Sequence, residues 1–109
     1  MRVDGMTPEG KVKQKITAWL KAHGIWYFMP RGTTFGRSGI PDYIACLHGR
    51  LIGIEAKAGS NKPTALQLLE HKKMRLAGAV VLVINEHNLG ELDAMLKEAE
   101  NENTCYSCP

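Results

Sequence analysis

The sequence feature that most constrains the fold is a pair of apolar segments separated by two residues. Residues 42–47 and 50–57 are rich in Ile, Leu and Ala, and His48-Gly49 lies between them. Two such segments joined by a short glycine-containing turn are typical of a β-hairpin. If the turn closes symmetrically, the residue numbers of cross-strand partners add up to 97. A one-residue bulge would shift this register, so the prediction holds for a regular hairpin.

The predicted register places two acidic side chains opposite one another. Asp42 faces Glu55 with Cβ atoms roughly 5 Å apart, and Lys57, two residues farther along, points to the same face. Facing carboxylates destabilise a sheet unless one is protonated, both pair with a lysine, or both bind a divalent cation. Mg²⁺ prefers such ligands and could activate water for phosphodiester hydrolysis. A salt-bridged polar patch at a sheet edge fits the same spacing equally well.

The residues around the hairpin favour a metal-binding catalytic site over a salt-bridged polar patch. The segment Ser38-Gly39-Ile40-Pro41 leads tightly into Asp42. Glycines at positions 36, 39 and 59 leave room for a backbone or a ligand to approach. In such a site, Lys57 could hold the attacking water or neutralise charge on the phosphate.

The remaining patterns predict helices and strands around the hairpin. Thr7-Pro8-Glu9 is typical of a helix start, and Thr64-x-x-Gln67 and Asn88-x-x-Glu91 resemble capping boxes. The predicted order is α-β-β-β-α-β-α: a helix from Thr7 to Gly24, a strand over 25–29, the hairpin, a helix from Thr64, a strand over 79–84 and a helix from Asn88. This order predicts one α/β domain over residues 1–101, with a mixed central sheet flanked by helices, and a disordered tail over 102–109.

Several residues carry expectations about burial. Trp26–Phe28 and Cys46 are predicted to lie in the core, and the apolar strand 79–84 to be buried on both faces. His71 is predicted to lie on a helix surface and His48 in the turn. Cys105 and Cys108 form a C-x-x-C pair in the tail, which supplies only half of a tetrahedral zinc site.

Charge is distributed unevenly along the chain. Residues 1–85 carry 13 Lys and Arg against 5 Asp and Glu, whereas residues 86–109 carry 1 Lys against 6 acids. A basic body attracts nucleic acid, although a solvated basic surface is about equally consistent with the charge alone. The longest apolar run, over 79–84, is too short to span a bilayer, and no secretory pattern precedes it. We therefore expect a cytoplasmic protein.

Taken together, Ser38-Gly39-Ile40-Pro41-Asp42 and the later Glu55-Ala56-Lys57 resemble a nuclease signature, PD-(D/E)xK. More closely, the chain from about Glu9 through Ile84 resembles the virus-type replication-repair nucleases, VRR-NUC, of the stand-alone viral or phage type. This resemblance implies a restriction-endonuclease-like fold. It also implies a site in which Asp42, Glu55 and the carbonyl of Ala56 bind Mg²⁺ or Mn²⁺ and Lys57 is catalytic.

The resemblance extends the site to two helices. Glu9 matches an additional family acid at the metal, directly or through water, and Gln67 matches a glutamine that supports the site or the DNA. Each also has a local explanation: Glu9 would favour the helix dipole, and Gln67 would complete a capping box.

The loops beside the hairpin supply candidate DNA contacts, although each of the charged ones is as consistent with a solvated loop side chain. These candidates are Arg31, Arg37, Ser38 and Lys62. Stand-alone members of the family resemble junction resolvases, so we expect a homodimeric, structure-selective endonuclease acting on Holliday junctions, in the host cytoplasm if viral. The alternatives are a flap-trimming or restriction-like nuclease and a non-catalytic DNA-binding subunit.

Overall fold

The computed structural model describes residues 6–31 and 38–102. Within them the chain forms seven elements in the predicted order: α1 (Pro8–Ala22), β1 (Trp26–Phe28), β2 (Tyr43–Leu47), β3 (Arg50–Ala56), α2 (Ala65–Leu76), β4 (Val80–Ile84) and α3 (Gly90–Glu102). The prediction of an α/β fold is confirmed. The tail cysteines, Arg37 and Gly36 lie outside the described residues.

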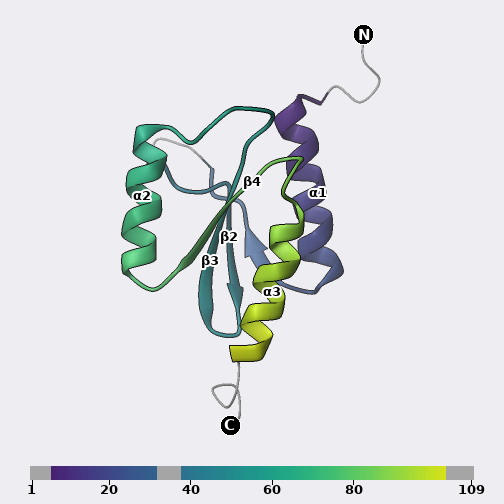
Figure 1. Ribbon diagram of the computed structural model, residues 1–109, viewed down its shortest axis with the longest axis vertical. Helices are drawn as coiled ribbons and strands as arrows, with labels where there is room; N and C mark the ends of the chain where they lie inside the picture. The colour runs from purple at the N-terminus through teal and green to yellow at the C-terminus, as the bar shows by residue number, and fades with distance from the viewer. Residues whose placement is uncertain (1–5, 32–37, 103–109) are drawn as a thin grey trace.

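The strands form one mixed sheet in the order β1-β2-β3-β4. β1, β2 and β3 pair antiparallel, and β4 pairs parallel with β3. A parallel pair needs a crossover connection, which here is α2. Figure 1 shows α2 on one side of the sheet, with α1 and α3 on the other. The sheet therefore has two different faces, one covered by two helices and one by a single helix.

The face beneath α1 and α3 holds the hydrophobic core. α1 begins at the predicted cap, where Thr7 Oγ1 accepts a hydrogen bond of 3.0 Å from the Gly10 N–H. Its buried side chains recur every four residues, as one face of a helix requires. Tyr43 is fully buried beneath this helix and donates a hydrogen bond of 2.7 Å to the carbonyl of Lys13. The start of β2 is thereby tied to α1. The core consists of Val12, Ile16, Leu20, Tyr43, Ala45, Leu47, Ile52, Ile54, Ala56, Ile84 and Leu92.

Two glycines allow α2 to lie close to the other face. A Cβ atom at Gly39 would lie 2.6 Å from the carbonyl oxygen of Leu66, and the φ angle of Gly39 is +87°. A Cβ atom at Gly53 would lie 2.9 Å from Met74 Cε. The first turn of α2 therefore packs directly on the segment that leads into Asp42.

α2 packs over β3 and β4 and leaves part of this face uncovered. Trp26 and Phe28 point to the α2 side because they pair with Cys46 and Ile44, which alternate with the core residues of β2. Trp26 is 63% exposed, and Phe28 and Cys46 are also exposed. The prediction that these three lie in the core was therefore wrong, because no described helix covers β1 and β2 on this side.

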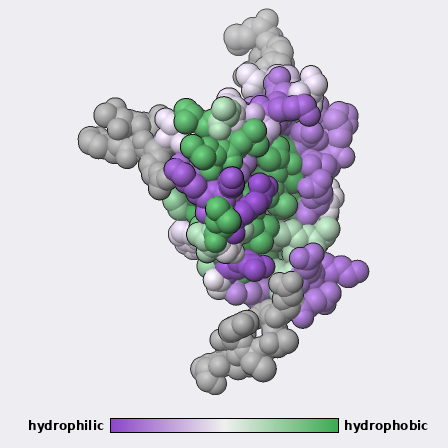
Figure 2. Space-filling model, turned by 60° about the vertical axis from the view of Figure 1, so that its left-hand side comes forward, coloured by the Kyte–Doolittle hydropathy of each residue, from purple (hydrophilic) through white to green (hydrophobic). Residues whose placement is uncertain are grey.

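The uncovered side chains lie on the same side of the molecule as exposed leucines on one flank of α2 (Figure 2). Leu66, Leu69 and Leu76 recur at helical spacing on that flank and are exposed. Figure 2 brings the side of the molecule that carries α2 forward and shows hydrophobic residues gathered across it, interrupted by hydrophilic ones. We call this surface the open apolar face and define it by Trp26, Phe28, Leu51, Leu66, Leu69 and Leu76.

Two further predictions about the C-terminal part were wrong. β4 is an edge strand of the described sheet, so Val80, Leu82 and Val83 are only partly buried. Asn88 does not cap α3, which begins at Gly90. Instead its side chain accepts a hydrogen bond of 2.7 Å from the Asn85 N–H and donates one of 2.9 Å to the carbonyl of Val83. Asn88 therefore shapes the turn between β4 and α3. No helix in residues 6–31 and 38–102 is long and apolar enough to cross a membrane.

The close packing of α2 on the segment before Asp42 can be tested with a matched pair of glycine substitutions. Gly24 also has a positive φ, +63°, but nothing lies within 4 Å of a Cβ atom there. Gly24→Ala should lower the free energy of unfolding by about 1 kcal/mol, from backbone strain alone. Gly39→Ala should lower it by about 3 kcal/mol, because overlap with the α2 backbone is added. Denaturant unfolding measures both, and equal losses would contradict the close packing.

Candidate active site

The hairpin register is the one predicted from the turn. β2 and β3 pair from Tyr43 opposite Ile54 to Leu47 opposite Arg50, so partner numbers add up to 97 without a bulge. Asp42 lies one residue before β2 and continues this register opposite Glu55. Its Oδ2 accepts a hydrogen bond of 2.8 Å from the Ala56 N–H, which holds the Asp42 carboxylate against the end of β3.

Glu55 is a buried carboxyl group with few compensating charges. Its side chain is 1% exposed on the sheet face that α2 covers. Burial raises the pKa of Glu55 to about 8, and Asp42 adds to the rise through its charge and a side-chain hydrogen bond. Lys57 opposes the rise, but its Nζ stands 3.9 Å from Glu55 Oε2. Without a further positive charge, the protein therefore favours the protonated form of Glu55 far more than water does.

Gln67 links α2 to this carboxyl group. Its Oε1 accepts a hydrogen bond of 2.8 Å from the Thr64 N–H, and Thr64 Oγ1 accepts one of 3.2 Å from the Gln67 N–H. The predicted capping box is therefore confirmed. The Gln67 Nε2 donates a second bond, of 3.0 Å, to Glu55 Oε2. One side chain thus both starts the helix and contacts the candidate site.

Glu9 reaches the site through a lysine. Its Oε2 lies 3.6 Å from Lys13 Nζ, and the same Nζ lies 3.6 Å from Asp42 Oδ1. The charge of Glu9 also contributes to the raised pKa of Glu55. The structure therefore brings Asp42, Glu55, Lys57 and Gln67 together. Glu9 contacts Lys13, which in turn contacts Asp42.

Sequence reasoning missed two residues at this site. Lys13 was assigned no role, and the spacing of charged residues along α1 does not reveal its contact with Asp42. His71 was predicted to lie on a helix surface, but it is fully buried, with Nε2 3.5 Å from Glu55 Oε1. Its position four residues after Gln67, on the same helix face, is the signal that could have found it.

The candidate DNA-contacting residues lie at the surface. Arg31, Ser38 and Lys62 are exposed, on the segments before β2 and between β3 and α2. The predicted contact by Arg37 lies outside the described residues. The exposed positions are suited to contact a large ligand, and their role in binding DNA stays a prediction.

The donor set fits a hard divalent cation. Asp42 and Glu55 offer two adjacent carboxyl groups, and Glu55 Oε1 has no hydrogen-bond partner among the described residues. The Ala56 carbonyl leaves the strand on the same side as its N–H, which points at Asp42. Residues 6–31 and 38–102 contain no cluster of three or more His, Cys, Asp or Glu that could hold a metal. Mg²⁺ commonly binds through one or two carboxylates and keeps its waters, so two suffice.

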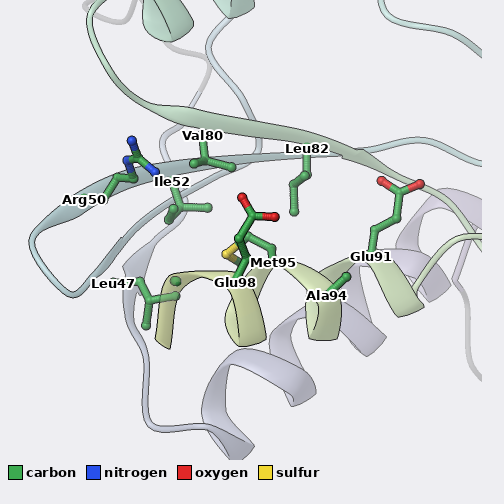
Figure 3. Close-up of a pocket in the computed structure, with 10 residues that line it drawn as sticks. Leu47, Arg50, Ile52, Val80, Leu82, Glu91, Ala94, Met95 and Glu98 are labelled. Atoms are coloured by element: carbon green, nitrogen blue, oxygen red, sulfur yellow. The ribbon is translucent and has the colours of Figure 1, made fainter. Parts of the chain in front are cut away.

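A cavity elsewhere in the molecule is separate from these residues. It measures about 260 Å³ and lies between α3 and the core face of the sheet, near the hairpin turn. Figure 3 shows Met95, Glu91 and Glu98 of α3 beside strand residues that include Ile52 and Leu82. Its walls are mainly apolar, and its charged side chains are Glu91, Glu98 and Arg50, so acids outnumber the one cation that a phosphate group would need.

Comparisons with known proteins agree with the fold. No family model matches the chain. The chain is 38% identical over 81 residues to "Putative nuclease p44" of Acyrthosiphon pisum secondary endosymbiont phage 1, across 73% of this chain and 84% of that protein. A solved structure of a VRR_NUC domain matches with a TM-score of 0.63 and 27% identity, across 88% of this chain and 94% of that one.

The fold and these relatives define the class of the molecule as an α/β nuclease. More specifically, the chain belongs to the VRR-NUC family. The resemblance drawn from Pro41-Asp42 and Glu55-Ala56-Lys57 is thereby confirmed.

The raised pKa of Glu55 makes stability depend on pH. Because folding raises this pKa, the folded state binds the proton more tightly than the unfolded chain, whose glutamate titrates near 4.5. The resulting stabilisation is complete below that value and is lost as pH rises through about 8. Glu55→Gln keeps a neutral side chain at all pH values. Without divalent metal, the melting temperature of the variant minus that of the wild type should therefore increase from pH 5 to pH 9, and a constant difference would contradict the assignment.

Proposed function

We propose that the chain is a metal-dependent endonuclease that hydrolyses phosphodiester bonds in DNA with Mg²⁺ or Mn²⁺. The observation that carries the proposal is that Asp42 lies against the end of β3 beside the buried Glu55, with Lys57 near Glu55. Asp42, Glu55 and the Ala56 carbonyl would hold the cation, and Glu9 would complete the site through water. The bound cation would activate water and stabilise charge on the phosphodiester.

The side chains of the protein supply positioning and charge. Gln67 donates a hydrogen bond to Glu55 Oε2 and so restricts the orientation of this carboxyl group. Lys57 carries a positive charge to within 3.9 Å of that carboxyl group, where it could orient the attacking water or neutralise the phosphate. The basic body of the chain, with 13 Lys and Arg over residues 1–85, favours the approach of DNA. Arg31, Arg37, Ser38 and Lys62 are proposed phosphate contacts.

We further propose that the enzyme is a homodimer that acts on Holliday junctions. The open apolar face supports the dimer. Its six large side chains expose on the order of 600 Å² of apolar surface, taking roughly 200 Å² for one fully exposed. That value is at the upper end for a monomer and approaches the ~800 Å² that each partner contributes to a standard interface. Paired cuts in a four-way junction would follow from two sites held at a fixed separation.

The catalytic assignment predicts two separable defects. Asp42→Asn should abolish Mn²⁺ binding measured by isothermal titration, because it removes a ligand charge. Lys57→Ala should keep Mn²⁺ binding but reduce kcat by about 10²–10⁴-fold, because it removes the group that acts on water or phosphate. Lys97→Ala, an exposed lysine on α3, is the matched control and should change neither. Undiminished Mn²⁺ binding by Asp42→Asn would refute the metal site.

The proposed dimer predicts which exposed side chains are needed for dimerisation. Leu69→Glu or Trp26→Glu should convert the dimer to monomers in sedimentation analysis, because either places charge within the open apolar face. Leu68 is also exposed on α2 but points to its other flank, so Leu68→Glu is the matched control and should stay dimeric. A monomeric wild type would refute the dimer.

Substrate choice separates the junction enzyme from its alternatives. The purified protein should cut four-way junctions in Mg²⁺ and leave linear duplex largely intact. Cutting confined to flaps or ends would indicate a trimming nuclease, and cutting at one base sequence a restriction-like enzyme. DNA binding without cutting of any of these substrates would indicate a non-catalytic subunit.

A further inference from the structure

Two buried side chains with unpaired polar atoms, Glu55 and His71, lie against each other beneath α2. His71 is fully buried, and its Nε2 lies 3.5 Å from Glu55 Oε1. Among the described residues, neither ring nitrogen of His71 nor Glu55 Oε1 has a hydrogen-bond partner. Buried polar atoms are nearly always paired, so an unpaired group of this kind requires an explanation.

The geometry of α2 relates His71 to Gln67. The two residues are four apart and therefore lie one above the other on the same helix face. Gln67 Nε2 donates to Glu55 Oε2 at 3.0 Å, and His71 Nε2 lies beside the other oxygen, Oε1. α2 thus presents two nitrogen groups, one turn apart, to the two oxygens of a single carboxyl group.

The His71 ring has a donor available for this position. An imidazole carries at least one N–H in either protonation state and can donate it to a carboxyl oxygen. The present separation exceeds the ~2.9 Å of an ordinary N–H···O bond, as is common before a catalytic site is loaded.

We infer that His71 is a positioning residue, which together with Gln67 fixes the plane of the Glu55 carboxylate toward Asp42. This inference rests on the proposed function, in which Asp42 and Glu55 hold a divalent cation. His71 touches neither cation nor substrate in this arrangement and acts only through Glu55. Groups that orient a metal ligand in this way typically change metal affinity by 10- to 100-fold when they are removed.

The test compares two substitutions of His71 in the full chain. His71→Leu removes both ring nitrogens and keeps an apolar side chain of moderate size, whereas His71→Gln keeps an N–H donor. Titration with Mn²⁺ alone should show binding weakened about 10- to 100-fold in His71→Leu and largely restored in His71→Gln. Met74→Leu, on the same helix face but packed against Gly53, is the matched control and should bind Mn²⁺ as the wild type does.

The melting temperature supplies a second readout. His71→Leu without metal should melt no lower than the wild type, because it replaces an unpaired buried polar group by an apolar one. A lower melting temperature without rescue of Mn²⁺ binding by His71→Gln would show a packing role and overturn the inference. Unchanged Mn²⁺ binding in His71→Leu would also overturn it, with the metal site intact. No Mn²⁺ binding by the wild type would instead refute the proposed metal site, and the inference with it.

Discussion

The structure is organised around the cost of burying the Glu55 carboxyl group opposite Asp42. Transfer of a carboxylate out of water is unfavourable unless charge or hydrogen bonds compensate. Here one lysine, one glutamine amide and one histidine ring contact Glu55, yet its pKa rises to about 8. The side chains alone therefore do not stabilise two ionised carboxylates at neutral pH. A divalent cation would supply the missing positive charge, which makes metal binding the simplest reason for a chain to retain this pair.

The position of α2 on the sheet brings a hydrogen-bond donor to the buried Glu55 carboxyl group. Gly39 and Gly53 remove the Cβ atoms that would hold the helix away from the sheet. With α2 this close, Gln67 can cap the helix with its oxygen and bind Glu55 with its nitrogen. The capping role of Gln67 is thus confirmed, and the same side chain contacts Glu55, while its support of a metal site stays a prediction. Formation of the helix and positioning of the carboxyl group are coupled through one side chain.

The parts of the molecule that could be predicted from sequence are those set by local rules. A two-residue turn at His48-Gly49 fixes the hairpin register. Counting residues outward from this turn was therefore enough to predict that Asp42 and Glu55 lie next to each other. The burial of His71 and the exposure of Trp26 and Cys46 did not follow. Each depends on where α2 sits on the sheet, and that placement comes from close contacts between distant segments, which periodicity does not encode.

The candidate site and the open apolar face lie on the same side of the sheet. Phe28 pairs with Ile44, only two residues from Asp42, so the hydrophobic surface begins beside the carboxyl groups. In the proposed homodimer, a two-fold axis through this face would hold the two sites at a fixed distance from each other. The choice of DNA substrate by such an enzyme would depend on how the DNA strands are spaced and bent, and much less on base sequence. In the proposed dimer, the hydrophobic face would then contribute to substrate specificity by setting the separation of the two sites.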